Sequence, residues 1–183
     1  MPILGIIASQ DYTRITSSYE SIASVTASGG ETSLTFSSIA GTYASLQIRG
    51  ISRRNAAGGF ANGLQINSDT GSNYAYHYLR GTGAAAQATG ASSQTFIIGT
   101  ASASATHAAS IFGVTIFDIL DYASTTKYKT VRGFGGFDAN GSGTIDLASG
   151  LWMNTAAITS VSLYAQGDAF AAGSTFALYG IKG

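Results

Sequence analysis

The chain has 183 residues, of which 45% are hydrophobic and only 10% are charged. Nine basic residues balance nine acidic residues, so the chain has no net field to attract nucleic acid or an anionic membrane. The absence of cysteine excludes disulfides and thiolate metal sites. The length fits one domain with a packed core. A surface that is poor in charge loses little hydration when a partner docks, so the composition favours a protein that works within an assembly.

An apolar stretch with four aliphatic residues opens the chain. These residues are Ile3, Leu4, Ile6 and Ile7. The stretch lacks the basic region of a secretory signal and is short for one, and no later apolar run approaches the roughly 20 residues that span a membrane. We therefore expect residues 1–18 to form an extended arm or first strand whose aliphatic side chains are interface candidates. Residues 19–183 are expected to form a single β-sandwich domain.

From residue 19 onward, the dominant pattern is an alternation of apolar and polar residues with a period of two. This pattern predicts half-buried strands, because successive side chains of a strand point to opposite faces. Strands are predicted near residues 19–27, 33–37, 45–49, 64–66, 74–79, 95–98, 111–120, 127–132, 145–147, 161–164 and 176–181. The run 111–120 is more continuously apolar, as is typical of a central strand covered on both faces.

Clusters of glycine and polar residues separate these strands at short intervals. With one proline and no convincing helical period, the pattern predicts an all-β fold, a single antiparallel, jelly-roll-like sandwich of about ten strands. Residues 81–110 are of low complexity, mostly Ala, Ser, Thr and Gly around Phe96-Ile97-Ile98. Two interpretations stay open for them: long surface loops around one strand, or a contact loop that becomes ordered against a neighbouring subunit.

Three tyrosines, Tyr74, Tyr76 and Tyr78, share one face of a predicted strand. An aromatic row on a sheet can stack on sugar rings, which would give a lectin-like face. The alternative is a packed aromatic face inside the sandwich or at a subunit interface, where tyrosine offers contact area and a hydrogen-bonding tip. We favour the packed face and keep the three residues as interface candidates.

Arg49, Arg53 and Arg54 form the basic cluster of the sequence. Three guanidinium groups could hold a phosphate or an acidic patch on a partner. The neutral background and the lack of interleaved aromatic residues argue against nucleic-acid binding. We therefore interpret the cluster as a candidate for salt bridges at a subunit interface.

Residues 138–146 resemble part of a calcium-binding EF-hand loop. Oxygen ligands are offered by Asp138, Asn140, Ser142 and Asp146. The last ligand position is Ser149 where a bidentate glutamate is required, and neither flank is typical of a helix. We therefore predict a β-hairpin that turns at Asn140-Gly141, with a calcium site as the weaker alternative. No other metal site and no cofactor are predicted.

Asp118 and Asp121 are the pair of carboxylates that could suggest a glycosidase. They lie three residues apart on one predicted strand, so their side chains should point to opposite faces. A hairpin in which Lys127 and Lys129 face acidic partners explains them better. The sequence also lacks a nucleophile elbow, a zinc-protease motif and a phosphate loop. We predict that the protein is not an enzyme and has no catalytic residues.

The order and combination of several segments carry a family resemblance. These segments are 35–39, 46–50, 69–74, 118–122, 127–130, 150–154 and 176–183. Together they resemble small structural proteins of tailed bacteriophages, over most of the chain after about residue 15. The resemblance implies a virion component with a jelly roll or a related sandwich, made in the host cytoplasm. It implies either a capsid cement (decoration) protein or a piece of the tail or fibre.

Of these two roles, we favour the cement protein. The short length, the single domain and the apolar N-terminal stretch fit a homotrimer that bridges subunits of the major capsid protein, with other virion proteins as further candidate partners. Tail fibres usually carry long repetitive or coiled-coil shafts, which this sequence lacks. The alternative is a tail or fibre component that binds a host-surface receptor or glycan. Neither role requires nucleic acid or a membrane as a partner.

Overall fold

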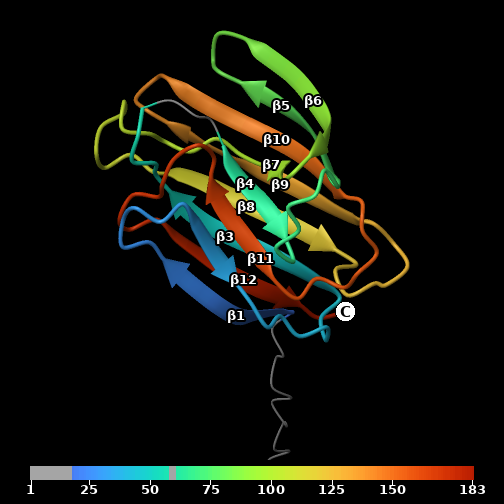
Figure 1. Cartoon of the computed structure of the whole chain (residues 1–183). Coiled ribbons are helices and arrows are strands. Elements are labelled where there is room, and N and C mark those ends of the chain that lie inside the picture. The colour runs from blue at the N-terminus through green and yellow to red at the C-terminus, as the bar shows by residue number, and fades with distance from the viewer. Residues whose placement is uncertain (1–17, 58–60) are drawn as a thin grey trace, which may run out of the picture.

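The computed structural model describes residues 18–57 and 61–183, none of which lies in a helix. Twelve strands form one sheet of eight and one of four, and all ladders between them are antiparallel. The two sheets pack as layers of a sandwich (Figure 1). The predicted all-β, antiparallel sandwich is therefore confirmed, with two more strands than the ten expected.

The large sheet contains eight strands. In spatial order they are β1 (Tyr19–Thr26), β12 (Thr175–Ile181), β3 (Ser45–Ser52), β8 (Gly113–Leu120), β9 (Lys129–Asp138), β10 (Gly143–Trp152), β5 (Tyr74–Gly81) and β6 (Ala86–Gln94). The small sheet contains four strands. In spatial order they are β2 (Ser33–Phe36), β11 (Val161–Ala165), β4 (Asn62–Ile66) and β7 (Ile97–Ile98).

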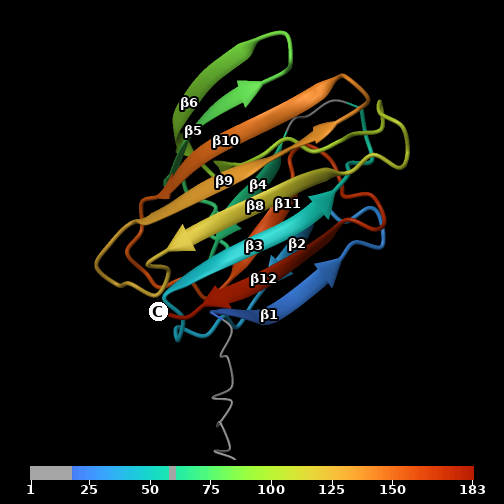
Figure 2. The same ribbon diagram turned by 180° about the vertical axis from the view of Figure 1, so that it is seen from behind.

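The strand pairs are nested within one another along the chain. β1 pairs with β12, β2 with β11, β3 with β8, and β4 with β7. This is the pairing of one long hairpin rolled into two sheets, which is the jelly-roll arrangement. In the outermost pair, the hydroxyls of Thr26 and Thr175 lie 3.0 Å apart although 149 residues separate them in sequence. Two further hairpins, β5–β6 and β9–β10, are inserted in this scheme and widen the large sheet (Figures 1 and 2).

The hydrophobic core lies between the sheets and follows the predicted alternation. Leu46 and Ile48 of β3 and Leu64 and Ile66 of β4 are fully buried, because every second side chain of each strand points to the facing layer. Where the two sheets approach each other most closely, a strand needs glycine because a Cβ atom would not fit. A Cβ added to Gly150 would lie 2.3 Å from a methyl carbon of Ile97 in the opposing sheet, so β7 rests directly on the backbone of β10.

The small sheet covers one face of the large sheet, while no described strand covers the other face (Figure 2). This arrangement overturns part of the prediction for residues 111–120. Strand β8 is central in the sheet, as predicted, but it is covered on one face only. Val114 and Leu120 remain 50% and 58% exposed, because nothing in the described part of the chain packs against them.

Residues 81–110, the low-complexity region, do not consist of long surface loops throughout, which was one of their two interpretations. Residues 86–94 form strand β6 at the edge of the large sheet, and residues 101–104 are buried. Main-chain pairing with β5 requires no apolar side chain, and small side chains fit into a crowded interior. Long surface loops are therefore the wrong description for these two segments.

Candidate interaction face

Half-exposed aliphatic and aromatic side chains gather on the uncovered face of the large sheet. They are Ile51, Leu79, Val114, Phe134, Ile145 and Leu147, each between 48% and 58% exposed. We call these six residues the apolar patch. A monomeric protein rarely leaves so many large apolar side chains together in water.

Strand register brings the patch together from distant parts of the sequence. Phe134 of β9 lies opposite Leu147 of β10, which lies opposite Leu79 of β5. In the neighbouring row, Ile51 of β3 lies opposite Val114 of β8. Residues directly opposite each other point to the same face at about 5 Å. The patch is therefore built on paired strands, whose backbones are fixed before any partner arrives.

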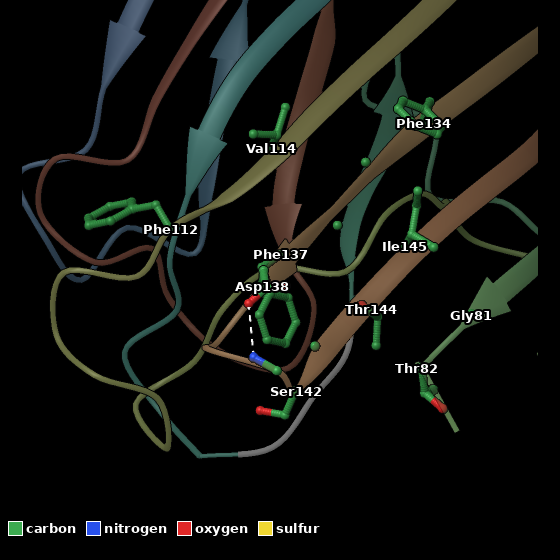
Figure 3. Close-up of a pocket in the computed structure, with 15 residues that line it drawn as sticks. Gly81, Thr82, Phe112, Val114, Phe134, Phe137, Asp138, Ser142, Thr144 and Ile145 are labelled. Carbon is green, nitrogen blue, oxygen red and sulfur yellow. Dashed lines mark hydrogen bonds between the residues drawn. The ribbon is translucent and has the colours of Figure 1, made fainter. Parts of the chain in front are cut away.

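Shallow hollows interrupt the patch where strands carry glycine or alanine. One hollow of about 530 Å³ lies at the end of the β9–β10 hairpin, where Val114, Phe134 and Ile145 surround a stretch of bare backbone at Gly135 and Gly136 (Figure 3). A second hollow of about 550 Å³ lies between Leu79, Leu147 and Ala88 on β6. Such hollows accept bulky apolar side chains of a partner.

A polar row borders the patch on the same face. In strand order, it consists of Gln47, Asp118, Arg132, Ser149 and His77. Within the row, the Gln47 amide donates a hydrogen bond of 2.6 Å to Asp118. The face thus has an apolar half, bordered on β3 by Arg49, and a hydrogen-bonding half, which is the composition of a protein interface with a polar rim.

The three arginines do not form the basic cluster expected from the sequence. Arg49 lies on the uncovered face, with its guanidinium 5.0 Å from the ring centroid of Tyr19 and 5.4 Å from that of Tyr179. Arg53 is buried and donates hydrogen bonds to three main-chain carbonyls of residues 107–111. It ties the loop before β8 to the end of β3.

Arg54 is also buried, and its Nε lies 3.7 Å from a carboxylate oxygen of Asp168. Desolvation lowers the pKa of Arg54, and the charge of Asp168 opposes this shift. Because Arg53 and Arg54 point into the molecule, only Arg49 of the three can meet a partner. The interpretation of a three-arginine interface cluster is corrected accordingly.

The tyrosine row lies on the covered face of the large sheet. Tyr74 is fully buried and packs against Trp152, with ring centroids 6.4 Å apart. Burial raises the pKa of Tyr74 above its ordinary value. Tyr76 and Tyr78 are partly buried and stack on each other at 6.4 Å. The packed face is therefore what the structure shows for Tyr74, whereas Tyr76 and Tyr78 keep some access to a partner.

The calcium-like segment forms the predicted hairpin. Asn140 and Gly141 both have positive φ, at 62° and 94°, and this is the backbone of a two-residue turn that favours Asn-Gly. The carboxylate of Asp138 accepts hydrogen bonds from the amides of Asn140 and Gly141, at 2.8 and 3.2 Å. Ser142 closes the turn, its carbonyl accepting from the amide of Ala139 at 2.6 Å.

Asp146, the last candidate calcium ligand, is bound elsewhere. Its two carboxylate oxygens accept hydrogen bonds of 2.7 and 2.9 Å from Arg80, and one also accepts from the amide of Ala101 at 2.5 Å. The hydrogen bonds that Arg80 donates to Asp146 raise the pKa of Arg80. The described residues contain no group of three or more His, Cys, Asp or Glu placed to hold a metal ion. Of the four candidate calcium ligands, Asp146 is therefore committed to Arg80 and the Ala101 amide, which leaves Asp138, Asn140 and Ser142 at the turn.

Adding calcium is expected to leave the melting temperature of the protein unchanged. Ion binding to the native state alone would raise this temperature, but Asp146 would first have to abandon its arginine inside the protein. The measurement is a thermal unfolding curve in excess calcium and in excess chelator. The Asp138→Ala variant, which loses the turn bonds, serves as the comparison. A calcium-dependent rise in the native protein that this variant lacks would restore the calcium site.

The residues considered for catalysis each have a separate partner. Asp118 is held by Gln47 on the uncovered face, and Asp121 forms an exposed ion pair of 2.7 Å with Lys127. The ion pair matches the predicted hairpin contact. Lys129 differs from its prediction, since it is buried and donates to the carbonyls of residues 124, 127 and 155.

The patch residues were not among the residues singled out from the sequence. The signal that could have found them is the continuous apolar run 111–120, which predicts burial on both faces of β8 while the structure covers one. Ile3, Leu4, Ile6 and Ile7 lie outside the described residues. Within the described part of the chain, no helix has the length and apolarity to cross a membrane. A scan against protein-family models and searches of curated proteins and solved structures found no match to this chain.

Proposed function

We propose that the protein is a non-catalytic structural component of a bacteriophage virion, a capsid cement protein that docks through its apolar patch onto capsid subunits. The phage assignment rests on the sequence resemblance. The mode of action rests on one structural observation, the uncovered apolar face of the large sheet. Docking of this face across two neighbouring capsid subunits would bridge them and resist their separation.

The size of the patch supports docking on a protein. Six half-exposed side chains of this kind expose on the order of 600 Å², the upper end of what a monomer usually leaves bare. With the bordering polar row, the face approaches the roughly 800 Å² that one partner contributes to a standard protein interface. Because paired strands hold the patch, little conformational entropy is lost on docking.

The expected partner surface is apolar and carries no charge at its centre. No patch residue is charged, and the charged residues of the face that lie nearest, Arg49, Asp118 and Arg132, stand at the border of the patch. A charged partner group placed on the patch would lose its water without gaining an ion pair. Around the rim, a partner would offer hydrogen-bonding groups to the polar row.

Particles assembled without the protein test this function. On heating, they are expected to release their genome at a lower temperature than complete particles. When the salt concentration is lowered stepwise, they are expected to release it at a higher salt concentration. The fluorescence of a dye that binds freed DNA measures both. Adding back the purified protein is expected to restore the original release temperature, and electron microscopy should then show its density on the head. Equal resistance of the two kinds of particle would refute the cement role.

A second function, binding of a host-surface glycan by a tail component, has one observation in its favour. A hollow of about 380 Å³ on the outer face of the small sheet is lined by Phe96, Tyr164, Gln65 and Asp168. Aromatic rings beside amide and carboxylate groups suit a sugar ring. A glycan array with the native protein separates the two functions, because a cement protein would bind none of the glycans.

A further inference from the structure

The two sheets have four edge strands, and three of them are poor templates for another chain. β2 and β7 have only four and two residues. β1 is interrupted by a bulge between Ser21 and Ala23, and its Glu20 pairs with Lys182 at 2.8 Å. Short strands, bulges and charges are the devices by which proteins block pairing at sheet edges.

The fourth edge strand, β6, lacks this protection over most of its length. Residues 86–91 pair one-to-one with β5 without interruption, and the irregularity at Tyr74 and Tyr76 follows only after them. The run Ala-Gln-Ala-Thr-Gly-Ala contains no charge and no proline. Residues 86–90 are all exposed, and the hairpin β5–β6 stands at the free end of the large sheet (Figure 1).

The turn before β6 determines which of its amides and carbonyls point away from β5. The amide of Thr82 donates to the carbonyl of Ala85 at 3.0 Å, so these two residues form a hydrogen-bonded pair. Hydrogen-bonded and non-hydrogen-bonded pairs alternate along an antiparallel ladder. Ala86, Ala88 and Gly90 are therefore the residues whose amides and carbonyls point away from β5, towards the open edge.

These three residues are two alanines and a glycine, the residue types with the smallest side chains. Their Cβ positions lie on the uncovered face, since Ala88 pairs with Leu79 and Gly90 with His77. On the uncovered face, a strand that approached this edge would meet the methyl groups of Ala86 and Ala88 and the His77 ring beside Gly90. On the other face it would meet the uncharged side chains of Gln87 and Thr89. Because residues 86–91 include no Lys, Arg, Asp or Glu, no like charges of these residues would be brought together.

We propose that β6 of one copy pairs with β6 of a second copy, antiparallel and about a two-fold axis at Ala88. This axis places Ala88 opposite its own counterpart and Ala86 opposite Gly90. Each of the three residue pairs exchanges two main-chain hydrogen bonds. A strand is complementary to itself in this arrangement, so the contact closes on two copies and uses the β6 edge of both.

Pairing at this edge joins the two large sheets into one continuous sheet. The two-fold axis of an antiparallel pair is perpendicular to the sheet, so both apolar patches face the same side. The dimer therefore presents twice the docking surface of one copy. The structure points to a dimer in place of the homotrimer expected from the sequence.

The test measures the mass of the full-length protein by sedimentation over a range of concentrations. The native protein is expected to be dimeric at micromolar concentrations. Ala88→Lys should weaken dimerisation at least tenfold, because it places two positive charges side by side on the exposed face without touching the monomer core. Ala88→Glu should do the same, and an equimolar mixture of the two variants should form a heterodimer. Hydrogen exchange should show a protected Gly90 amide in the native dimer and an exposed one in either variant alone.

Two control variants make the result specific. Ala23→Lys makes the same substitution on the opposite edge strand and should leave the dimer intact, as should Phe134→Asp in the apolar patch. A native protein that stays monomeric, an assembly that survives Ala88→Lys, or a loss of assembly in Ala23→Lys would each overturn the proposal. If Ile6→Asp were the one variant that lost assembly, the contact between copies would be assigned to the N-terminal segment and not to β6. The dimer is tested apart from the cement function, because sedimentation uses the purified protein without particles and Phe134→Asp changes the patch while leaving β6 unchanged.

Discussion

Replacing Phe134 with aspartate is expected to abolish attachment to the particle while the protein stays folded. Phe134 is half-exposed at the centre of the apolar patch, so an aspartate there is solvated in the free protein. In the complex, the variant would lose about 2 kcal/mol of aromatic burial and would also bury an unpaired carboxylate. The affinity should fall by at least about a hundredfold, at about 1.4 kcal/mol per factor of ten. Co-sedimentation of purified protein with depleted particles measures it.

Tyr128→Asp is the matched control for this substitution. Tyr128 is aromatic and 55% exposed, close to the 50% of Phe134, but it lies in the turn before β9 and outside the patch. It should bind depleted particles like the native protein. If Phe134→Asp bound equally well with an unchanged melting temperature, the patch would not be the docking surface.

Replacing Arg80 with methionine is expected to lower the free energy of unfolding by about 3–5 kcal/mol, the usual effect of removing one partner of a buried ion pair. The Arg80 and Asp146 side chains are 7% and 0% exposed, and the shortest distance between their charged atoms is 2.7 Å. Without the guanidinium, the amide of Ala101 is the donor that the described residues still offer to the carboxylate of Asp146. Urea denaturation of the variant and the native protein measures the difference.

An ion pair of the same length provides the control. Lys127 and Asp121 also lie 2.7 Å apart, but their side chains are 63% and 57% exposed. Lys127→Met should therefore change the free energy of unfolding by less than about 1 kcal/mol. The double variant Arg80→Met/Asp146→Leu should regain part of the loss, since no buried charge is left without a partner. Equal effects of the two single variants would show that burial does not set the strength of the Arg80 pair.

Much of the fold could be predicted from the sequence because burial follows the alternation of side chains. Leu34 and Phe36, for example, mark β2 through their period of two, and both are buried. Asn140-Gly141 marks the β9–β10 turn because few other residue pairs adopt its backbone. Strand β6 could not be found in this way, since its side chains are small or polar on both faces and show no apolar–polar alternation.

The apolar patch lay beyond prediction for a different reason. The sequence shows that Val114 and Phe134 are apolar, but a strand pattern does not reveal which layer covers them. The burial of Arg53 depends on carbonyls more than 50 residues away, and that of Asp146 on an arginine 66 residues away. Such partners are set by the order of strands in the sheet, which local patterns do not contain.

The nested pairing of strands has a consequence for synthesis. The ladder between β1 and β12 joins Thr26 to Thr175, 149 residues later. At about 5–20 residues per second, a ribosome takes roughly 7–30 s to make that stretch. The hairpins β5–β6 and β9–β10 close within microseconds of leaving the ribosome. The first strand of the sandwich therefore waits without its partner while the inserted hairpins are already formed, and the emergence of β12 is the event that closes the fold.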